Sequence, residues 1–375
     1  MISENLISQA KSFLPRKLEK TLRLELAGHK SVLLLGSRRA GKTSVLKRLI
    51  SYLIETQKQP SAQVFYYDLE NISDLNDLES VASNPLQILD LSKTKGADIK
   101  KKVYIFIDEV QYLNNPSSLL KLTYDHLVNI QIVASGSSTL KIKQKLKDSL
   151  VGRKHTYLLH PLTFIEFLEF NNRRDLSEVI VKRPKEAFRV PSINNDLKKM
   201  TEEFIVFGGY PEIVLLSSDD EKIRELSEIY SDYVKKDIKD FLNIDNLDKF
   251  SQLAKILSVN AGNLINLQDL NCDLGLSKPT VENYLFLLEN TYTLSRITPF
   301  YQNKRKEIIA AKKVFFNDTG LRNFLINNFS SLSSRVDSGA LFENAVFGEP
   351  NREQRLILLK LRGLNSARLR PKIKT

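Results

Sequence analysis

The sequence predicts an α/β fold, in which a parallel sheet carries helices on both faces and is followed by a helical lid and a winged-helix domain. Two apolar runs predict the sheet, because residues 32–35 and 103–107 have the length of strands and carry no charge. Continuous runs of this kind are typical of strands buried on both faces, as in parallel sheets. Each run is followed by residues suited to phosphate or metal, at the end of the strand where open α/β sheets hold their ligands.

The first run leads into a glycine-containing loop and then a helix. Residues 36–43 read Gly-Ser-Arg-Arg-Ala-Gly-Lys-Thr, which is the spacing of a phosphate-binding loop, or P-loop. Glycines let backbone N–H groups approach an anion closely, Lys42 supplies charge for the β- and γ-phosphates, and the Thr43 hydroxyl is placed to bind Mg²⁺. The sequence therefore predicts a P-loop NTPase sheet whose nucleotide is held by Gly36, Ser37, Arg38, Arg39, Ala40, Gly41, Lys42 and Thr43.

The second run ends in two acids, Asp108 and Glu109. We expect Asp108 to hold Mg²⁺ together with Thr43, and Glu109 to orient and deprotonate the water that attacks the γ-phosphate. An Asp-Glu pair after a buried strand is also found in plain helix-capping turns. The P-loop about 65 residues upstream favours the metal-binding interpretation.

A further strand, residues 130–135, ends in Gly-Ser-Ser. In ATPases of this layout a polar side chain here lies between the acids and the γ-phosphate; Ser137 is the first candidate and Ser138 the second, with an ordinary turn as the alternative. We expect Arg153 to lie just past the sheet and to reach a γ-phosphate in its own chain or in a neighbouring copy, unless it is a surface arginine. No Asn-Lys-x-Asp sequence follows to read guanine, which favours ATP over GTP.

Charge and composition predict a cytoplasmic protein whose positive charge is concentrated at one end. Half of the formal net charge of +12 lies in residues 348–375, and a basic tail indicates a polyanion partner less strongly than a basic body. No apolar run approaches the ~18 residues of a membrane span, and the N-terminus lacks a signal-peptide layout. The single cysteine, Cys272, fits a reducing compartment, and it makes no zinc-ligand spacing with the histidines.

The second half of the chain reads as helices followed by a winged helix. Residues 164–210 predict the start of the lid, with a polar, proline-interrupted linker at 171–195. Residues 264–274 and 280–288 predict two short helices, and the strands at 293–297 and 314–316 enclose a basic segment formed by Lys304, Arg305, Lys306, Lys312 and Lys313. Such a wing is suited to DNA phosphates, but winged helices also bind proteins, so either partner is left open.

Taken in order, the motifs resemble those of one family, the prokaryotic AAA-type ATPases that carry a C-terminal domain of the DUF4143 type. The motifs are Gly-Ser-Arg-Arg-Ala-Gly-Lys-Thr, Ile-Phe-Ile-Asp-Glu-Val-Gln, Ala-Ser-Gly-Ser-Ser, Leu-Val-Gly-Arg with His-Pro-Leu-Thr-Phe-Ile-Glu-Phe, Gly-Gly-Tyr-Pro-Glu at 208–212, Tyr-Val-Lys-Lys-Asp-Ile at 233–238 and Val-Phe-Phe-Asn-Asp-Thr-Gly-Leu at 314–321. The resemblance covers about residues 15–347 and implies a cytoplasmic ATP-binding protein and ATPase. It also implies that Gln111 lies close to the catalytic water.

These patterns divide the chain into an ATPase core at 1–163, a helical lid at 164–245, a winged helix at 246–330, and a truncated nuclease-like start with a basic tail at 331–375. In relatives, Gly-Ala-Leu-Phe-Glu-Asn at 339–344 opens a restriction-nuclease-like fold, but the resemblance stops at Phe347. Because only Glu349 and Glu353 remain as acids, we predict no nuclease activity. The abrupt change to a basic tail suggests a frameshift in the gene.

Three hypotheses follow for function. The leading one is Mg²⁺-dependent ATP binding with slow hydrolysis by in-line attack of water, with Glu109 as base, Ser137 as γ-phosphate sensor and Arg153 as transition-state cation. The second is a nucleotide-gated module, in which ATP sets the lid and the winged helix grips DNA or a protein. The third is a defective fragment that still binds ATP. The sequence leaves open whether a homo-oligomer completes the site.

Overall fold

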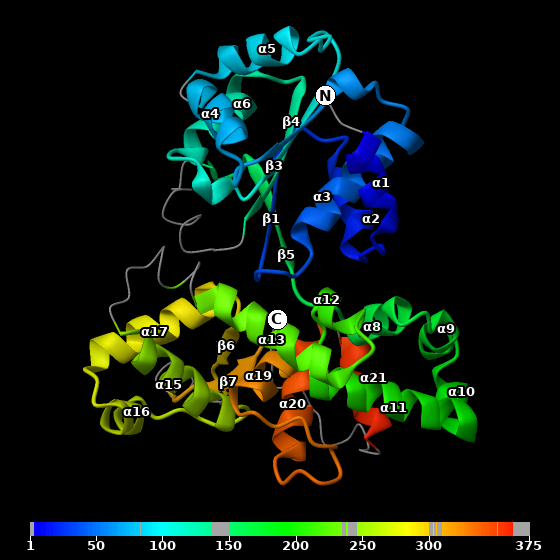
Figure 1. The fold of residues 1–375 in the computed structure, drawn as a ribbon, viewed down its shortest axis with the longest axis vertical. Helices are drawn as coiled ribbons and strands as arrows, with labels where there is room; N and C mark the ends of the chain where they lie inside the picture. The colour runs from blue at the N-terminus through cyan, green and yellow to red at the C-terminus, as the bar shows by residue number, and fades with distance from the viewer. Residues whose placement is uncertain are drawn as a thin grey trace. The chain divides into compact units, whose positions relative to one another are not determined.

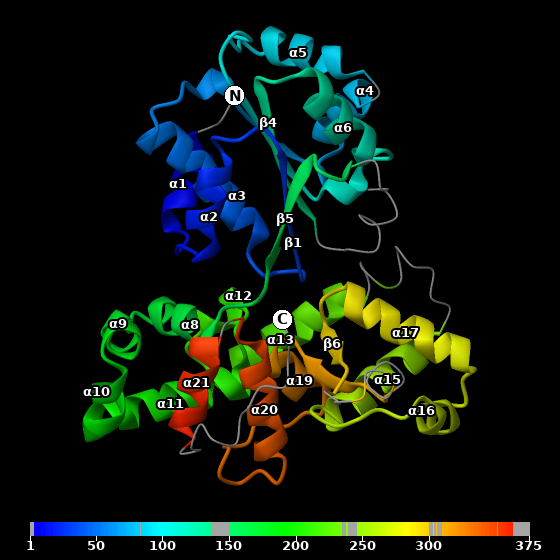
Figure 2. The same cartoon turned by 180° about the vertical axis from the view of Figure 1, so that it is seen from behind.

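The computed structural model describes residues 4–82, 84–136, 150–234, 238, 246–299, 303, 305, 310–350 and 352–362. Contacts divide the chain into two compact units, residues 1–159 and 160–375, called unit 1 and unit 2 below. Figures 1 and 2 show unit 1 in blue to green and unit 2 in green to red.

Unit 1 is built on a five-stranded parallel sheet in the order β2-β3-β4-β1-β5. Its strands are β1 (Ser31–Gly36), β2 (Val64–Asp68), β3 (Val103–Asp108), β4 (Ile130–Gly136) and β5 (Lys154–Leu159). Every residue of β1, β3 and β4 is buried, as the continuous apolar runs predict. The α/β fold class is therefore confirmed.

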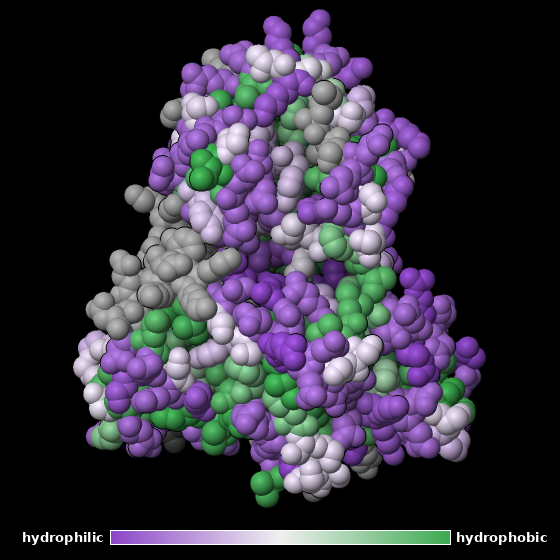
Figure 3. Space-filling model, in the orientation of Figure 1, coloured by the Kyte–Doolittle hydropathy of each residue, from purple (hydrophilic) through white to green (hydrophobic). Residues whose placement is uncertain are grey.

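Helices cover both faces of this sheet (Figures 1 and 2). One face carries α1 (Glu4–Ser12), α2 (Leu18–Glu25) and α3 (Lys42–Ser51), which continues into a π-helical turn, η1 (Tyr52–Thr56); the other carries α4 (Ile72–Val81), α5 (Pro85–Thr94) and α6 (Pro116–His126). Alternate strand residues such as Val32, Leu34 and Phe106 join α2 and α3 in one buried cluster. The face of unit 1 seen in Figure 3 is mostly hydrophilic, and the residues of this apolar cluster are buried.

Strand β5 was not expected from the sequence. It lies at the edge of the sheet beside β1, and only Leu159 of its six residues is buried. A half-exposed edge strand lacks the continuous apolar run from which β1 and β3 were predicted. The position of β5 changes where Arg153 lies. Arg153 was expected just past the last strand of the sheet, but it directly precedes β5.

Unit 2 begins with a series of helices. These are α8 (Phe164–Phe170), α9 (Arg174–Lys182), α10 (Pro184–Arg189), α11 (Pro191–Phe207), α12 (Pro211–Val214) and α13 (Asp219–Asp232). The linker predicted at 171–195 is therefore wrong, since α9, α10 and the first turn of α11 occupy it. Pro184 and Pro191 each lie in a first helical turn, where proline is tolerated because its missing N–H has no partner in the helix.

The rest of unit 2 combines helices with a two-stranded antiparallel sheet of β6 (Leu294–Ile297) and β7 (Lys313–Phe316). The helices are α15 (Leu247–Val259), α16 (Leu267–Leu274), α17 (Lys278–Asn290), α19 (Thr319–Leu325), α20 (Ser338–Gly348) and α21 (Arg352–Leu361). The helices α16 and α17 and the strands β6 and β7 lie close to the two helices and two strands predicted from the sequence, while the winged helix itself stays a prediction. Ser277 caps α17 by accepting a hydrogen bond from the N–H of Thr280. Lys304 and Lys306 of the predicted wing lie outside the described residues.

Among the residues that the structure describes, no helix combines the length and the apolar character needed to cross a membrane.

Candidate functional site

The phosphate loop joins the end of β1 to the start of α3. At Gly36 a Cβ atom would collide with the carbonyl oxygen of Leu159 in β5, so the close packing of β1 against β5 requires glycine. Arg39 (φ 58°) and Gly41 (φ 94°) adopt left-handed backbone conformations on either side of Ala40. Alternation of this kind turns successive N–H groups toward one side of the backbone, where they form an anion-binding concavity.

Lys42 lies inside this loop and is 4% exposed. Its Nζ donates hydrogen bonds to the carbonyl oxygens of Ser37 (2.9 Å) and Gly36 (3.3 Å). Lys42 is also the first residue of α3, so its charge and the helix N-terminus act at the same place. The arrangement can stabilise an anion with several phosphate oxygens.

Arg38, an arginine of the same loop, contacts residues beyond the loop. Its Nη1 lies 3.9 Å from Oε1 of Glu70, which follows β2, and its side chain also bonds Tyr112. The loop is thus connected to the ends of β2 and β3.

Asp108 ends β3 and is 2% exposed. Its carboxylate accepts hydrogen bonds from the hydroxyls of Tyr66 (3.0 Å), Ser135 and Thr43. Burial raises the pKa of this carboxyl group, against the opposing effect of these hydrogen bonds. The structure therefore brings together Thr43 and Asp108, whose hydroxyl and carboxylate oxygens are ligands of the kind that Mg²⁺ takes.

Glu109 adopts a left-handed backbone conformation (φ 56°, ψ 52°) that is uncommon for a residue with a side chain. Its N–H donates to Oγ of Ser135 (3.1 Å), and Nε2 of Gln111 donates to its carboxylate. A backbone conformation of this kind costs about 1–3 kcal/mol and persists where the surrounding contacts impose it, often at functional sites. Gln111, 1% exposed, lies beside the carboxylate proposed to activate water.

Two residues of this site were missed in the sequence. Ser135 lies at the end of β4, fully buried, and bridges the carboxylate of Asp108 and the backbone N–H of Glu109. Tyr66 lies on β2, and burial beside Asp108 raises the pKa of its hydroxyl, so it remains a hydrogen-bond donor. The sequence signal for these residues was a polar side chain within a mostly apolar strand. This signal alone does not indicate which residue the polar side chain contacts.

Not every predicted residue joins the site. Ser137 and Ser138 lie outside the described residues. Arg153 lies at the N-terminal ends of β1 and β5, whereas the phosphate loop follows the C-terminal end of β1. The register of the parallel pair shows this, because Ser31 pairs with Lys154 and Gly36 pairs with Leu159. The length of the strand, about 20 Å, separates Arg153 from the phosphate loop. The prediction that Arg153 reaches the γ-phosphate of its own chain is therefore corrected.

Arg153 instead forms an ion pair on the side of unit 1 away from the loop. Its Nε lies 2.7 Å from Oδ1 of Asp125 in α6, and this hydrogen bond raises the pKa of the guanidinium and lowers that of Asp125. About a third of the Arg153 side chain is exposed. Both residues stabilise each other at the surface.

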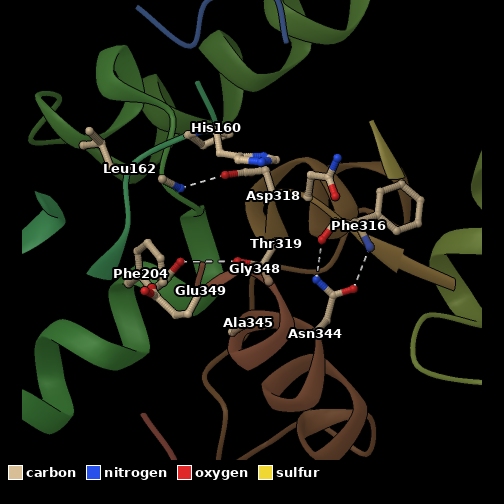
Figure 4. A pocket seen from close by; sticks show the side chains of 13 residues that line it. His160, Leu162, Phe204, Phe316, Asp318, Thr319, Asn344, Ala345, Gly348 and Glu349 are labelled. Carbon is tan, nitrogen blue, oxygen red and sulfur yellow. Dashed lines mark hydrogen bonds between the residues drawn. The ribbon is translucent and has the colours of Figure 1, made fainter. Parts of the chain in front are cut away.

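Unit 2 contains a small cavity of about 20 Å³, drawn in Figure 4. Its lining includes Asp318, Asn344 and Glu349, and these polar groups are tied to backbone: Asn344 both accepts from and donates to Phe316, and Glu349 accepts from the N–H of Phe164 (2.7 Å). A space of this size holds about one water molecule. The cavity has no room for a nucleotide.

Comparisons with known proteins find two family models that match parts of the chain. Residues 28–168, which include the sheet of unit 1 and the start of unit 2, match the family model described as an AAA domain. Residues 198–332 match a domain of unknown function, DUF8612. The DUF4143 type suggested by the motifs is not shown, since the matching domain of unknown function is a different one.

The relatives that match over most of the chain are described as uncharacterized proteins. Two proteins of Methanocaldococcus jannaschii are 27% identical over 89% of this chain and 25% identical over 84%, and a protein of Haemophilus influenzae is 25% identical over 78%. The matches cover 69%, 66% and 68% of these proteins, so the chain spans about two thirds of their length.

Solved structures to which the chain shows a weak similarity include the Aeropyrum pernix Orc1 protein in complex with DNA, at 13% identity and a TM-score of 0.34 over 85% of this chain and 94% of that one. Cdc6p from Pyrobaculum aerophilum gives 14% identity and a TM-score of 0.35 over 80% and 92%. TM-scores this low do not allow individual elements of the two structures to be matched.

Proposed function

We propose that unit 1 binds ATP with Mg²⁺ and hydrolyses the γ-phosphate by in-line attack of water. The observation that carries the proposal is the hydrogen bond between Thr43 and Asp108, because it joins the phosphate loop to the acids at the end of β3. Two residues of the predicted metal site, 65 positions apart, meet where a parallel sheet holds its ligands. The match of residues 28–168 to an AAA domain supports nucleotide binding.

Each residue has a distinct task in this proposal. Backbone N–H groups from Ser37 to Lys42 bind phosphate oxygens, and Lys42 neutralises their charge. Thr43 and Asp108 would hold Mg²⁺, which supplies positive charge to the phosphates. Glu109 takes the proton of the attacking water, and Gln111, bonded to the Glu109 carboxylate, orients it.

The remaining predicted residues complete the proposal from outside the described site. Ser137 is kept as the candidate γ-phosphate sensor at the end of β4. Arg153 would act only on the nucleotide of a neighbouring copy in a homo-oligomer, because its place in unit 1 excludes its own nucleotide. ATP is preferred to GTP, since no guanine-reading sequence follows β4. The single cysteine fits a cytoplasmic location.

The direct test is phosphate release from Mg-ATP by the purified chain, with Lys42→Ala beside it. Lys47→Ala is the matched control, because Lys47 is a partly exposed lysine of the same helix whose Nζ donates a hydrogen bond to Gln9. We expect turnover to disappear in Lys42→Ala and to persist in the control. Glu109→Gln should bind ATP with unchanged affinity but hydrolyse it much more slowly. Equal turnover in wild type and Lys42→Ala would refute the proposal.

A second candidate is a nucleotide-gated module that binds DNA or a protein through unit 2. The helices α16 and α17 followed by the antiparallel strands β6 and β7, which lie near the helices and strands expected of a winged helix, favour it. Against phosphate contact, two described basic residues here, Arg296 and Lys313, form ion pairs with Glu289 and Glu343. Binding of duplex DNA that weakens steeply with salt and changes with ATP would support DNA as the partner.

A further inference from the structure

The segment before the first strand holds a buried arginine that contacts the phosphate loop. Arg16 lies between α1 and α2 and is 7% exposed. Its Nη1 donates a hydrogen bond of 2.8 Å to the carbonyl oxygen of Ala40, which is itself fully buried. The contact links residues 24 positions apart, within unit 1.

The carbonyl of Ala40 lies in a part of the loop where such a partner is needed. It lies between the left-handed residues Arg39 and Gly41, so its peptide orientation is part of the turn that directs N–H groups toward an anion. A carbonyl turned away from the anion and buried must be hydrogen-bonded elsewhere, or its desolvation opposes that conformation. Arg16 supplies a charged donor for it.

Arg16 is in turn held by a buried carboxylate. Glu19, 2% exposed, accepts hydrogen bonds from the backbone N–H of Arg16 (2.9 Å) and from Nε of Arg48 (2.7 Å). Arg48 lies on α3, and its Nη1 also donates to the carbonyl of Phe13 (2.6 Å). The helix that follows the phosphate loop therefore clamps the segment that carries Arg16.

We propose that Arg16 is a positioning residue of the nucleotide site: it holds the Ala40 peptide in the orientation that presents the loop N–H groups to the phosphates of the nucleotide. The inference rests on the proposed function. Arg16 acts through the loop and does not touch the reacting atoms, so its loss reduces affinity for both ATP and ADP. Its position also explains why the segment at 13–19 belongs to the nucleotide-binding unit.

The test is equilibrium binding of Mg-ATP and Mg-ADP to wild type, Arg16→Ala, Arg16→Lys and Lys20→Ala, with thermal unfolding of each in the absence of nucleotide. Lys20 is an exposed basic residue of α2 and serves as the control. We expect Arg16→Ala to weaken both nucleotides about 10-fold, as for a lost charge-assisted hydrogen bond. Arg16→Lys keeps a cationic donor and should recover most of the affinity, and Lys20→Ala should match wild type.

Distinct outcomes separate this inference from the proposed function. If wild type binds nucleotide and Arg16→Ala binds it equally well, Arg16 does not position the loop. A lower melting temperature in Arg16→Ala with unchanged nucleotide affinity would also overturn the inference, because it shows a purely structural role. If Arg16→Ala does not fold, Arg16→Gln replaces it, and the same 10-fold loss is expected since its shorter neutral side chain does not reach Ala40. Failure of wild type itself to bind nucleotide would refute the proposed function.

Discussion

Two buried aspartates lie just after or at the end of strands in this protein, Asp108 at the end of β3 in unit 1 and Asp318 two residues after β7 in unit 2. Burial raises the pKa of both, and that of Asp318 reaches about 6. Their partners differ. Asp108 accepts from the hydroxyls of Thr43, Tyr66 and Ser135, whereas Asp318 accepts from backbone N–H groups, including those of Gly209 (2.7 Å) and Leu321 (2.9 Å).

The kind of donor separates a candidate ligand site from a fixed structural contact. A hydroxyl rotates and can turn from a carboxylate to a metal-bound water or a phosphate, so the surroundings of Asp108 can be rearranged. A backbone N–H in a turn has one direction, and those around Asp318 fix the start of α19. A buried carboxylate is therefore a sign of function only when its partners can be exchanged.

Glycines reinforce the fixed character of the Asp318 contact. Gly208 has φ 81° and ψ −167°, a region that essentially only glycine occupies, and a Cβ there would collide with the Asp318 carboxylate. At Gly320 a Cβ would collide with the carbonyl of Phe207. The Gly-Gly and Asp-Thr-Gly motifs are thus explained by close backbone packing between α11 and α19.

The largest expected difference is in turnover. Asp108→Asn removes the negative charge of one carboxylate ligand from the proposed metal site. We expect phosphate release from Mg-ATP to fall about 100- to 1,000-fold, as when a preorganised electrostatic group is lost. Asp318→Asn should change turnover less than about twofold. Equal loss of turnover in the two variants, with both folded, would remove the distinction between them.

The next effect is on stability. Gly208→Ala adds backbone strain and a collision with Asp318, and we expect the free energy of unfolding of unit 2 to fall by about 3–5 kcal/mol. Gly275→Ala is the matched control, since Gly275 also has a positive φ (61°) but no atom within 4 Å of its Cβ position; it should cost only about 1 kcal/mol. Urea unfolding followed by circular dichroism measures both, and similar midpoints would show that the contact is not tight.

Asp318 also predicts a pH dependence. Its pKa is about 6 in the folded protein and 3.8 for an ordinary aspartate, so between these values the folded state holds a proton that the unfolded chain has lost. Stability contributed by this group is therefore full below about pH 4 and is lost as the pH rises through 6, by about 3 kcal/mol. The measurement is urea unfolding at pH 4 to 7 for wild type minus Asp318→Asn; a flat difference would contradict it.

The smallest effect sharpens the role of the exchangeable donors. Ser135→Ala removes the bridge between Asp108 and the N–H of Glu109, and we expect turnover to fall about 10-fold with ATP affinity nearly unchanged, as for one lost hydrogen bond. Ser117→Ala, which removes the hydroxyl of a buried serine on α6, is the control. Loss of ATP affinity without loss of turnover would assign Ser135 to the loop instead.

Sequence reasoning located the site better than it located the residues around it. The continuous apolar runs of β1 and β3, the strand β4 and the loop between Gly36 and Thr43 lie where predicted, because strands that are buried on both faces are composed mostly of apolar residues. The half-exposed edge strand β5 has a less apolar sequence, so it is harder to predict. Because β5 was not predicted, Arg153 was expected past the last strand of the sheet. In the structure Arg153 precedes β5 and forms an ion pair with Asp125.

The sequence by itself determined the class of fold, the phosphate loop and the two acids, since each depends on residues that are neighbours in the chain. Only the tertiary structure decided which side chains meet across the sheet: Thr43 with Asp108, Ser135 with Glu109, and Arg16 with Ala40. It also decided that Asp318 caps a helix against Gly209, 109 residues away. Such contacts depend on strand order and helix packing, which no local pattern of residues specifies.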